Sequence, residues 1–328
     1  MLQSQDNASA ARTCLILSAI AMSLVLIVCV VVALGFVVNL GDDDDGPPAD
    51  QRGTVVADAD DPPLLFSVID VGQGACVVVV TPDGRTLVAD VGRSQGRVRE
   101  IVIPYLREQG VERIDYLVAT NPDQDHIGGM PAILEAMEVG AWVDPVVSTT
   151  NQTYAASLEI VAEMGIEPIR ARRGGTLDLG PDVTAEILWP VDPLMMDGSQ
   201  ESRNDNSIVI RITHGDVAFL ITGDIEDNAE EALVEADEDD LLRADVMVVP
   251  HHGSNTSSTA DFLDAISPTV AIIPVGLDNQ YGHPRDEVIQ RLRFRSIRVY
   301  RTDLDGTIEV RSNGEAYQVQ VVGTEDGS

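Results

Sequence analysis

The sequence predicts an α/β protein in which two β-sheets face each other and helices cover their outer faces. From about Leu64 onward, short apolar runs of strand length alternate with turn signals. Two β-hairpin patterns open two halves of the chain, and each half continues with alternating helix and strand patterns. Two halves of this kind indicate two sheets that share a core, with the helices outside. Hydrophobic residues make up 44% of the 328 residues, which is enough for a sizeable core.

The first half begins with an apolar strand over 65–69 that leads into Asp70-Val-Gly-Gln-Gly74. Two further strands, 75–80 and 86–91, flank Thr81-Pro-Asp-Gly84, which is a strong hairpin turn. The remaining elements expected in this half are a helix over 97–109, a strand over 116–119, and helices over 130–137 and 155–164.

The second half opens with strands over 207–213 and 217–221 around the turn His214-Gly-Asp216. We expect His214 to be exposed at this turn and to lie outside any functional site. The elements expected next are an acidic helix over 227–242, a strand over 246–249, a helix over 259–265, a strand over 270–275, a helix over 284–292, and a strand pair over 297–301 and 307–310.

The charge balance of the chain is strongly acidic. Asp and Glu total 54 against 21 basic residues, which gives a net charge of −33, and every basic residue is Arg. Such a surface binds cations and repels nucleic acid at low salt. An acidic, lysine-free surface favours a high-salt habitat, where charges are screened within about 3 Å near 1 M salt. The alternative is a GC-rich genome that favours codons for Arg, Asp and Ala.

The three cysteines leave only one thiol in the globular part of the chain. Cys14 and Cys29 lie in or beside the apolar N-terminal segment, and Cys76 lies in Ala-Cys-Val-Val-Val-Val. A disulfide within the body is therefore excluded, as is a cysteine-based zinc site. We interpret Cys76 as a buried strand thiol.

The N-terminal region predicts a membrane anchor. The 26 residues of 15–40 contain no charge, and as a helix they would span about 39 Å, enough to cross a bilayer. The segment is too long for a cleaved signal peptide. We therefore expect a cytoplasmic N-terminus at 1–14, a single-pass signal anchor at 15–40, an acidic Gly/Pro linker at 41–62 and a folded, extracytoplasmic domain at 63–323. Arg12 before the segment and the Asp run 42–45 after it agree with this orientation.

Residues that can bind a metal ion gather where predicted strands end. Asp123, Asp125 and His126 follow the strand 116–119 within four residues. Taken alone, these residues fit a capped turn as well as a cation site. Further Asp and His residues follow other strands in the same way: Asp224, then His251 and His252, then His283 in Tyr-Gly-His-Pro. The combination favours a metal site.

These motifs, in this order, resemble those of the metallo-β-lactamase superfamily. They are Asp-Val-Gly-Gln-Gly, Asn-x-Asp-x-Asp-His-x-Gly-Gly, Asn-Asp-Asn-Ser, Thr-Gly-Asp, Pro-His-His-Gly-Ser and Tyr-Gly-His-Pro. Within the superfamily, the stretch from Leu64 to Arg311 resembles the soluble domain of ComEC-type DNA-uptake competence proteins. The resemblance implies an αββα sandwich, a metal-dependent hydrolase, and phosphodiesters such as DNA or nucleotides as substrates. One anchor cannot form a DNA channel, so a membrane channel partner is expected.

The resemblance also implies roles for individual residues. The metal ligands would be Asp123, Asp125, His126, Asp224, His251 and His283. Asp224 would bridge the metal ions, and Asp125 and Asp224 would be catalytic. Residues expected beside the ligands, as additional ligands or as orienting partners, are Asn121, Asp70, Asp90, Asn206 and His252.

Asn121 departs from the family pattern, because the motif usually opens with His at this position. An amide oxygen is a weaker ligand than an imidazole nitrogen, and an oxygen-rich site favours hard cations. We expect one or two divalent ions, Mn²⁺ or Zn²⁺, with Mg²⁺ as a further option. Either the enzyme is intact, or the domain is a degenerate relative that binds a ligand or partner without turnover. A hydrolase of another ester, amide or lactone is a further alternative.

Two charged segments have alternative interpretations. The arginines at 291, 293, 295, 298 and 301 can bind a polyanion or pair with nearby acids. The acidic run 226–240 indicates a solvated helix face and not a calcium loop, since it lacks the required glycine and spacing.

Overall fold

The structure is a computed structural model that describes residues 63–195, 200–237, 239–277 and 279–322. The predicted N-terminus, membrane anchor and linker at 1–62 lie outside the described residues. Among the helices within those ranges, none combines the length and the apolar character that a membrane crossing requires.

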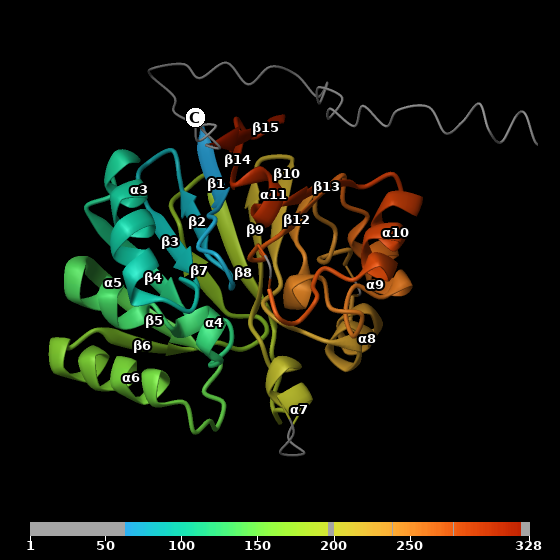
Figure 1. Ribbon diagram of the computed structural model, residues 1–328. Helices are drawn as coiled ribbons and strands as arrows, with labels where there is room; N and C mark the ends of the chain where they lie inside the picture. The colour runs from blue at the N-terminus through green and yellow to red at the C-terminus, as the bar shows by residue number, and fades with distance from the viewer. Residues whose placement is uncertain (1–62, 196–199, 238, 278, 323–328) are drawn as a thin grey trace, which may run out of the picture. The chain divides into compact units, whose positions relative to one another are not determined.

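Two β-sheets form the centre of the domain, as the sequence predicts (Figure 1). The first sheet has the strand order β15-β14-β1-β2-β3-β4-β5-β6, and the second has the order β13-β12-β11-β10-β9-β8-β7. The strands of the first sheet are β1 (Leu64–Val68), β2 (Val77–Val80), β3 (Thr86–Ala89), β4 (Arg113–Val118), β5 (Glu138–Asp144), β6 (Glu167–Arg170), β14 (Thr307–Ser312) and β15 (Tyr317–Val322). Those of the second are β7 (Thr176–Asp178), β8 (Val183–Trp189), β9 (Val209–His214), β10 (Val217–Ile221), β11 (Val246–Val248), β12 (Val270–Ile273) and β13 (Arg298–Arg301).

The two sheets share a plan. In each, a hairpin is followed by parallel strands: β2 and β3 lead into β4, β5 and β6, and β9 and β10 lead into β11, β12 and β13. Parallel neighbours need crossover connections, which carry the helices onto the outer face of each sheet.

Helices cover both outer faces, which gives four layers (Figure 1). On the first sheet lie α2 (Gln95–Arg97), a π-helical turn (Val98–Val102) and α3 (Ile103–Glu108), which form one continuous helical stretch, together with α4 (Gln124–Ile127), α5 (Met130–Ala136) and α6 (Gln152–Met164). On the second lie α8 (Asp227–Glu235), α9 (Ala260–Ile266) and α10 (Asp286–Phe294). Three short helices complete the described chain: α7 (Gln200–Asn204), the 3₁₀ turn η2 (Pro250–Gly253) and α11 (Thr302–Asp305).

The layers are held together by apolar packing. One buried cluster lies between the sheets, where the Phe66 and Phe219 rings stack with centroids 4.8 Å apart. A second cluster lies between the first sheet and its helices, and a third lies between the second sheet and its helices. Burial of such side chains contributes about 1.5–3 kcal/mol each, which makes the sandwich a rigid support for its loops.

Both predicted hairpins are confirmed, but the predicted strand pair near the C-terminus is wrong. β13 pairs with β12 in the second sheet, whereas β14 pairs with β1 and β15 in the first. The helix α11 and Gly306, which has φ 76° and ψ −147°, redirect the chain between them. A glycine permits this conformation at low cost.

Two other expectations are corrected. The acidic helix ends at Glu235, well before residue 242. In a helix that continued to residue 242, Asp239 and Asp240 would lie in the last turn, where the negative end of the helix dipole repels carboxylates. His214 is buried, with 8% of its surface exposed, and its Nδ1 lies 3.3 Å from Ser312 Oγ on the neighbouring sheet. Cys76 is buried, as predicted, but it lies just before β2 and not in the strand.

Candidate metal centre

The predicted metal-binding segments meet at one edge of the sandwich. Parallel strands of both sheets end there: β4 leads to the segment 119–126, β10 to Asp224, and β11 to His251 and His252. Ligands bind characteristically outside the carboxyl ends of parallel strands. The fold therefore brings together residues that are more than a hundred positions apart in sequence.

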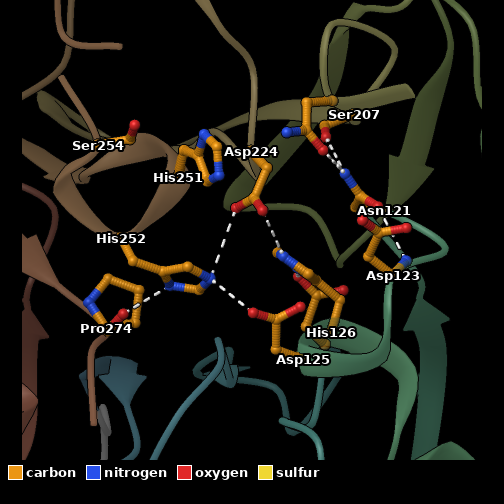
Figure 2. A network of polar contacts seen from close by, with 12 residues as sticks. Asn121, Asp123, Asp125, His126, Ser207, Asp224, His251, His252, Ser254 and Pro274 are labelled. Atoms are coloured by element: carbon orange, nitrogen blue, oxygen red, sulfur yellow. Dashed lines mark hydrogen bonds and ion pairs between the residues drawn. The ribbon is translucent and has the colours of Figure 1, made fainter. Parts of the chain in front are cut away.

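Asp125, His126 and His252 form the group best placed to hold a cation (Figure 2). One ligand atom from each lies within 4.8 Å of the others. Asp224 completes the group, because its Oδ2 lies 2.9 Å from His126 Nε2 and its Oδ1 lies 3.8 Å from His252 Nε2. Asp125 Oδ2 lies 3.5 Å from the same His252 nitrogen. Two imidazoles and two carboxylates thus face a common point.

Buried partners fix the orientation of both imidazoles. His126 Nδ1 lies 2.7 Å from Asp90 Oδ2, and Thr120 donates its backbone N–H and its hydroxyl to the same carboxylate at 2.8 and 2.5 Å. His252 Nδ1 lies 2.7 Å from the carbonyl oxygen of Pro274. An acceptor at each Nδ1 places the ring proton there, so that Nε2 presents its lone pair to the centre.

Backbone conformation at the site is unusual. Asp90, His251 and His252 have φ values of 59°, 50° and 54°, in the left-handed region that non-glycine residues rarely adopt. Such conformations cost about 1–3 kcal/mol each and persist only where the surrounding structure imposes them. Their presence at three residues of the site indicates that the side-chain arrangement is held against local preference.

The donor set fits a divalent cation. His126 Nε2 and His252 Nε2 are buried, and the polar groups that they face are the carboxylates of Asp224 and Asp125, which are themselves candidate ligands. Burial opposes ionisation of Asp224, but His126, His252 and His251 outweigh it and hold the pKa of the carboxyl below its usual range. Burial also opposes ionisation of Asp125, while His252 and His126 keep its pKa low. Burial opposes protonation of His126 and His252, but the neighbouring carboxylates outweigh it and raise the pKa of both rings. A divalent cation would displace these protons, and two imidazole nitrogens beside two carboxylates then suit Zn²⁺ or Mn²⁺.

The other side of the centre is arranged differently. Asn121 is fully buried, and its Nδ2 donates to Asn204 Oδ1 at 3.0 Å and to Ser207 Oγ at 3.1 Å. Its Oδ1 accepts the backbone N–H of Asp123 at 2.9 Å (Figure 2). Both ends of the amide are therefore engaged in hydrogen bonds. Asp123 is partly exposed and lies 3.6 Å from Arg203 Nε, so that its charge has a cationic partner.

His251 stands beside the group without joining it. Its Nδ1 lies 3.0 Å from Glu226 Oε1, and its side chain is 22% exposed. Glu226 is buried and also accepts from Asn204 Nδ2 at 2.9 Å. His283 lies further out, where its Nδ1 faces the carbonyl oxygen of His251 at 3.2 Å and the two rings are 5.6 Å apart. The resemblance had suggested His251 and His283 as ligands, whereas the ring that faces Asp125 and His126 is that of His252.

Two further residues named from sequence form local hydrogen bonds, and none of the described hydrogen bonds joins their side chains to the group. Asp70 accepts the backbone N–H of Gly72 at 2.9 Å and forms a turn. Asn206 accepts from Met195 N at 3.0 Å and donates to the Met195 and Ser202 carbonyls, which closes a loop.

Sequence reasoning missed several residues that shape the site. They are Thr120, Asn204, Ser207, Glu226 and Pro274. Ser207 and Asn204 lie in or next to the Asn-Asp-Asn-Ser motif, which was a usable signal. Glu226 follows Asp224 by two positions, but it belongs to the acidic run that the sequence predicts to be solvated. In the folded chain the Glu226 side chain contacts His251, which the sequence alone does not reveal.

The two charged segments are also resolved. Arg295 pairs with Asp264 at 2.7 Å, Arg301 with Asp303 at 2.6 Å, and Arg291 donates to backbone carbonyls of 257 and 258. The arginines at these positions thus serve local structure. In the acidic run, Glu230 is fully buried and accepts the backbone N–H groups of 258 and 259, so the helix face is solvated only in part.

Comparison with known proteins agrees with this geometry. Residues 69–276 match the model of the Metallo-beta-lactamase superfamily. The chain is 32% identical over 260 residues to "ComE operon protein 3" of Bacillus subtilis, which covers 74% of this chain and 32% of that protein. It is 32% identical over 249 residues to "Competence protein ComA" of Neisseria gonorrhoeae, covering 74% of this chain and 31% of that protein. It is 26% identical over 262 residues to "Recombination protein 2" of Haemophilus influenzae, covering 79% and 30%. The chain therefore spans about a third of the length of these relatives.

Proposed function

This chain belongs to the metallo-beta-lactamase superfamily, and we propose that it is a metal-dependent phosphodiesterase or nuclease that acts on DNA or nucleotides. The observation that carries the proposal is the convergence of Asp125, His126, His252 and Asp224, in which two buried imidazole nitrogens face two carboxylates. The competence proteins among its relatives support a nucleic-acid substrate.

The residues of the chain divide the chemical work. When bound, a divalent cation supplies a hydroxide nucleophile near neutral pH and polarises a phosphoryl oxygen. Asp90 and the Pro274 carbonyl hold the protons of His126 and His252 on Nδ1, which keeps both Nε2 atoms available as ligands. His251 carries a proton at the exposed side of the centre, with Glu226 at its Nδ1 to stabilise the imidazolium. Its Nε2 is the group that can protonate the leaving oxygen.

We propose that the centre holds one tightly bound ion, Mn²⁺ or Zn²⁺, with Mg²⁺ as a weaker substitute. The amide of Asn121 is engaged by Asn204, Ser207 and the backbone of Asp123, and Asp123 itself faces Arg203. A second ion on this side would have to displace those interactions. Their loss would leave buried polar groups unpaired, at a cost of about 1–3 kcal/mol each.

The test combines cleavage with metal content. The full chain is incubated with labelled DNA in molar salt, with and without Mn²⁺, beside the variants Asp224→Ala and Asp216→Ala. Asp216 is an exposed carboxylate at the β9–β10 turn and serves as the matched control. We expect cleavage only with metal, its loss in Asp224→Ala, and close to one equivalent of bound ion by elemental analysis. A folded chain that cleaves no DNA with any divalent metal would overturn the nuclease proposal.

A second candidate is a binding domain without turnover, which the hydrogen-bonded Asn121 favours. A chain that retains bound metal and binds DNA but leaves it uncleaved would support this candidate. Hydrolysis of a non-phosphate ester, amide or lactone in the same assay would support the remaining alternative.

We further propose that the domain is tethered by the apolar segment 15–40, with its body outside the cytoplasm and a membrane channel as partner. The uncharged segment and the relatives' greater length support this arrangement. Added protease should digest the body in spheroplasts while the cytoplasmic membrane is intact. Protection of the body under those conditions would contradict the orientation.

A further inference from the structure

A pocket whose lining segments are hydrogen-bonded to the metal-binding segments contains two arginines that have no assigned role. The pocket has a volume of about 500 Å³ and is lined by residues that include Asp70, Gln73, Arg93, Ser94, Arg97 and Gly276. Resting on the proposed phosphodiesterase function, we propose that Arg93 and Arg97 bind a phosphate of the nucleic-acid substrate next to the phosphate that is cleaved.

The position of the pocket follows from how its walls are attached. The wall that carries Arg93 is bonded to the helix α4, since Val91 N donates to the carbonyl oxygen of His126 at 2.9 Å and Gln124 Nε2 donates to that of Arg93 at 3.4 Å. Gly128 fits closely there, because a Cβ at this residue would lie 2.2 Å from the Arg93 carbonyl oxygen. Arg93 is therefore fixed relative to the ligand His126.

The other two walls are attached to the remaining ligands. The segment 70–73 continues to Ala75, whose N–H donates to the carbonyl oxygen of Asp125 at 3.2 Å. Gly276 follows two residues after Pro274, whose carbonyl oxygen binds His252, and its N–H donates to Gln73 Oε1 at 3.3 Å. All three walls of the pocket thus adjoin segments that carry Asp125, His126 and His252.

The pocket combines two arginines with two aspartates, one of which already has an arginine partner outside the pocket. Arg93 and Arg97 are both exposed, and within the described residues neither forms an ion pair. Of the two carboxylates in the lining, Asp303 is paired with Arg301 at 2.6 Å, which leaves Asp70 alone against two arginines. In a chain of net charge −33, such a site is a local attractor for an anion.

The chemistry of the two side chains specifies the ligand. A guanidinium presents several N–H donors in a planar fork that matches two phosphate oxygens. The Ser94 hydroxyl, which accepts the backbone N–H of Arg97 at 3.4 Å, can donate its own proton to a third oxygen. A phosphodiester strand whose scissile group lies at the metal centre would extend its neighbouring phosphate into this pocket, so the pair would select polymeric over small phosphodiesters.

The test compares two arginine substitutions in the full chain. Arg93→Gln with Arg97→Gln removes the proposed site. Arg99→Gln is the matched control, because Arg99 lies in the same helical stretch but is paired with Glu135 at 2.9 Å. Binding of a labelled single-stranded oligodeoxynucleotide is measured by fluorescence anisotropy over a range of salt concentrations. Hydrolysis of the oligonucleotide and of bis(p-nitrophenyl) phosphate is measured alongside.

We expect the double variant to bind the oligonucleotide about tenfold more weakly. The slope of log affinity against log salt should become shallower by about 0.7, since the site neutralises one phosphate of a single strand. The rate on the small phosphodiester should stay unchanged. Equal binding by the wild type and the double variant, or an equal loss in Arg99→Gln, would overturn the proposal. Arginine-dependent binding without any cleavage would uphold the phosphate site while refuting the proposed catalysis.

Discussion

The two sides of the candidate centre differ, although both draw on the same short segment, which runs from the end of β4 through α4. On one side, Asp125 and His126 join His252 and Asp224 in a group whose ligand atoms face one another. On the other side, Asn121 is fully bonded to Asn204 and Ser207. The contrast teaches that a metal-binding position is defined by unsatisfied donor atoms, because a polar side chain whose hydrogen bonds are complete gains nothing from a cation.

The largest expected effect comes from the side that binds metal. His252→Ala should lower affinity for Mn²⁺ by more than about 100-fold, because removal of an outer partner alone costs about 10–100-fold and here a ligand is lost. Isothermal titration calorimetry on the full chain measures this. His283→Ala is the comparison, since His283 faces the backbone of His251. Equal losses in both variants would contradict the assignment of His252.

A smaller effect on metal affinity is expected at Asp90, which contacts the candidate ligand His126. Asp90→Asn should lower metal affinity by about 10–100-fold, because an amide holds the proton of His126 on Nδ1 less firmly than a carboxylate does. Asp70→Asn should leave affinity unchanged, since Asp70 bonds only to the turn at Gly72 in the described contacts of its side chain. The same titration distinguishes them. An unaltered affinity in Asp90→Asn would remove Asp90 from the site.

On the opposite side of the centre, substitution of Asn121 should lower the stability of the fold and leave metal affinity unchanged. Asn121→Ala removes hydrogen bonds to Asn204 and Ser207 and leaves both buried, which should lower the free energy of unfolding by about 1–3 kcal/mol. Urea denaturation of the metal-free chain measures the loss, and titration should give the same metal affinity within about twofold. A marked fall in affinity would mean that Asn121 is a ligand after all.

The smallest effect is expected at Cys76. Burial, with the nearby Asp90 charge, raises the pKa of its thiol far above the usual range, so the reactive thiolate is scarce at neutral pH. In a chain whose Cys14 and Cys29 are replaced by Ser, Ellman's reagent should not react until denaturant is added, with or without a chelator. If Ellman's reagent reacted after chelation without denaturant, loss of the metal ion would have exposed the Cys76 thiol to solvent.

Much of the fold could be predicted from sequence, because its signals are local. The hairpins at 81–84 and 214–216 carry turn residues between apolar runs, and both formed as expected. The pairing of β14 with β1 could not be predicted, since the two strands are far apart in sequence and no local signal specifies which strands become neighbours. The predicted helix over 227–242 is too long, since α8 ends at Glu235.

The candidate site was predictable to the level of segments and not of individual rings. The motifs identified the loops that carry Asp125, His126, Asp224 and His252, but not the loop of Pro274. Which of His251 and His252 turns inward depends on backbone dihedrals near φ 50° and 54° and on the Pro274 carbonyl, none of which is visible in a sequence. The role of Glu226 likewise depends on its burial against His251.

The place of β14 has a consequence for how the protein is made. β1, the first described strand, lies between β2 and β14, and the backbone of Asp70 donates to the Thr307 hydroxyl across 237 residues. During synthesis, the β1 edge therefore stays unpaired until almost the whole body has left the ribosome. An open edge of this length is an aggregation hazard in a nascent chain. Truncation before residue 307 should therefore yield insoluble protein even though every metal-binding residue is retained.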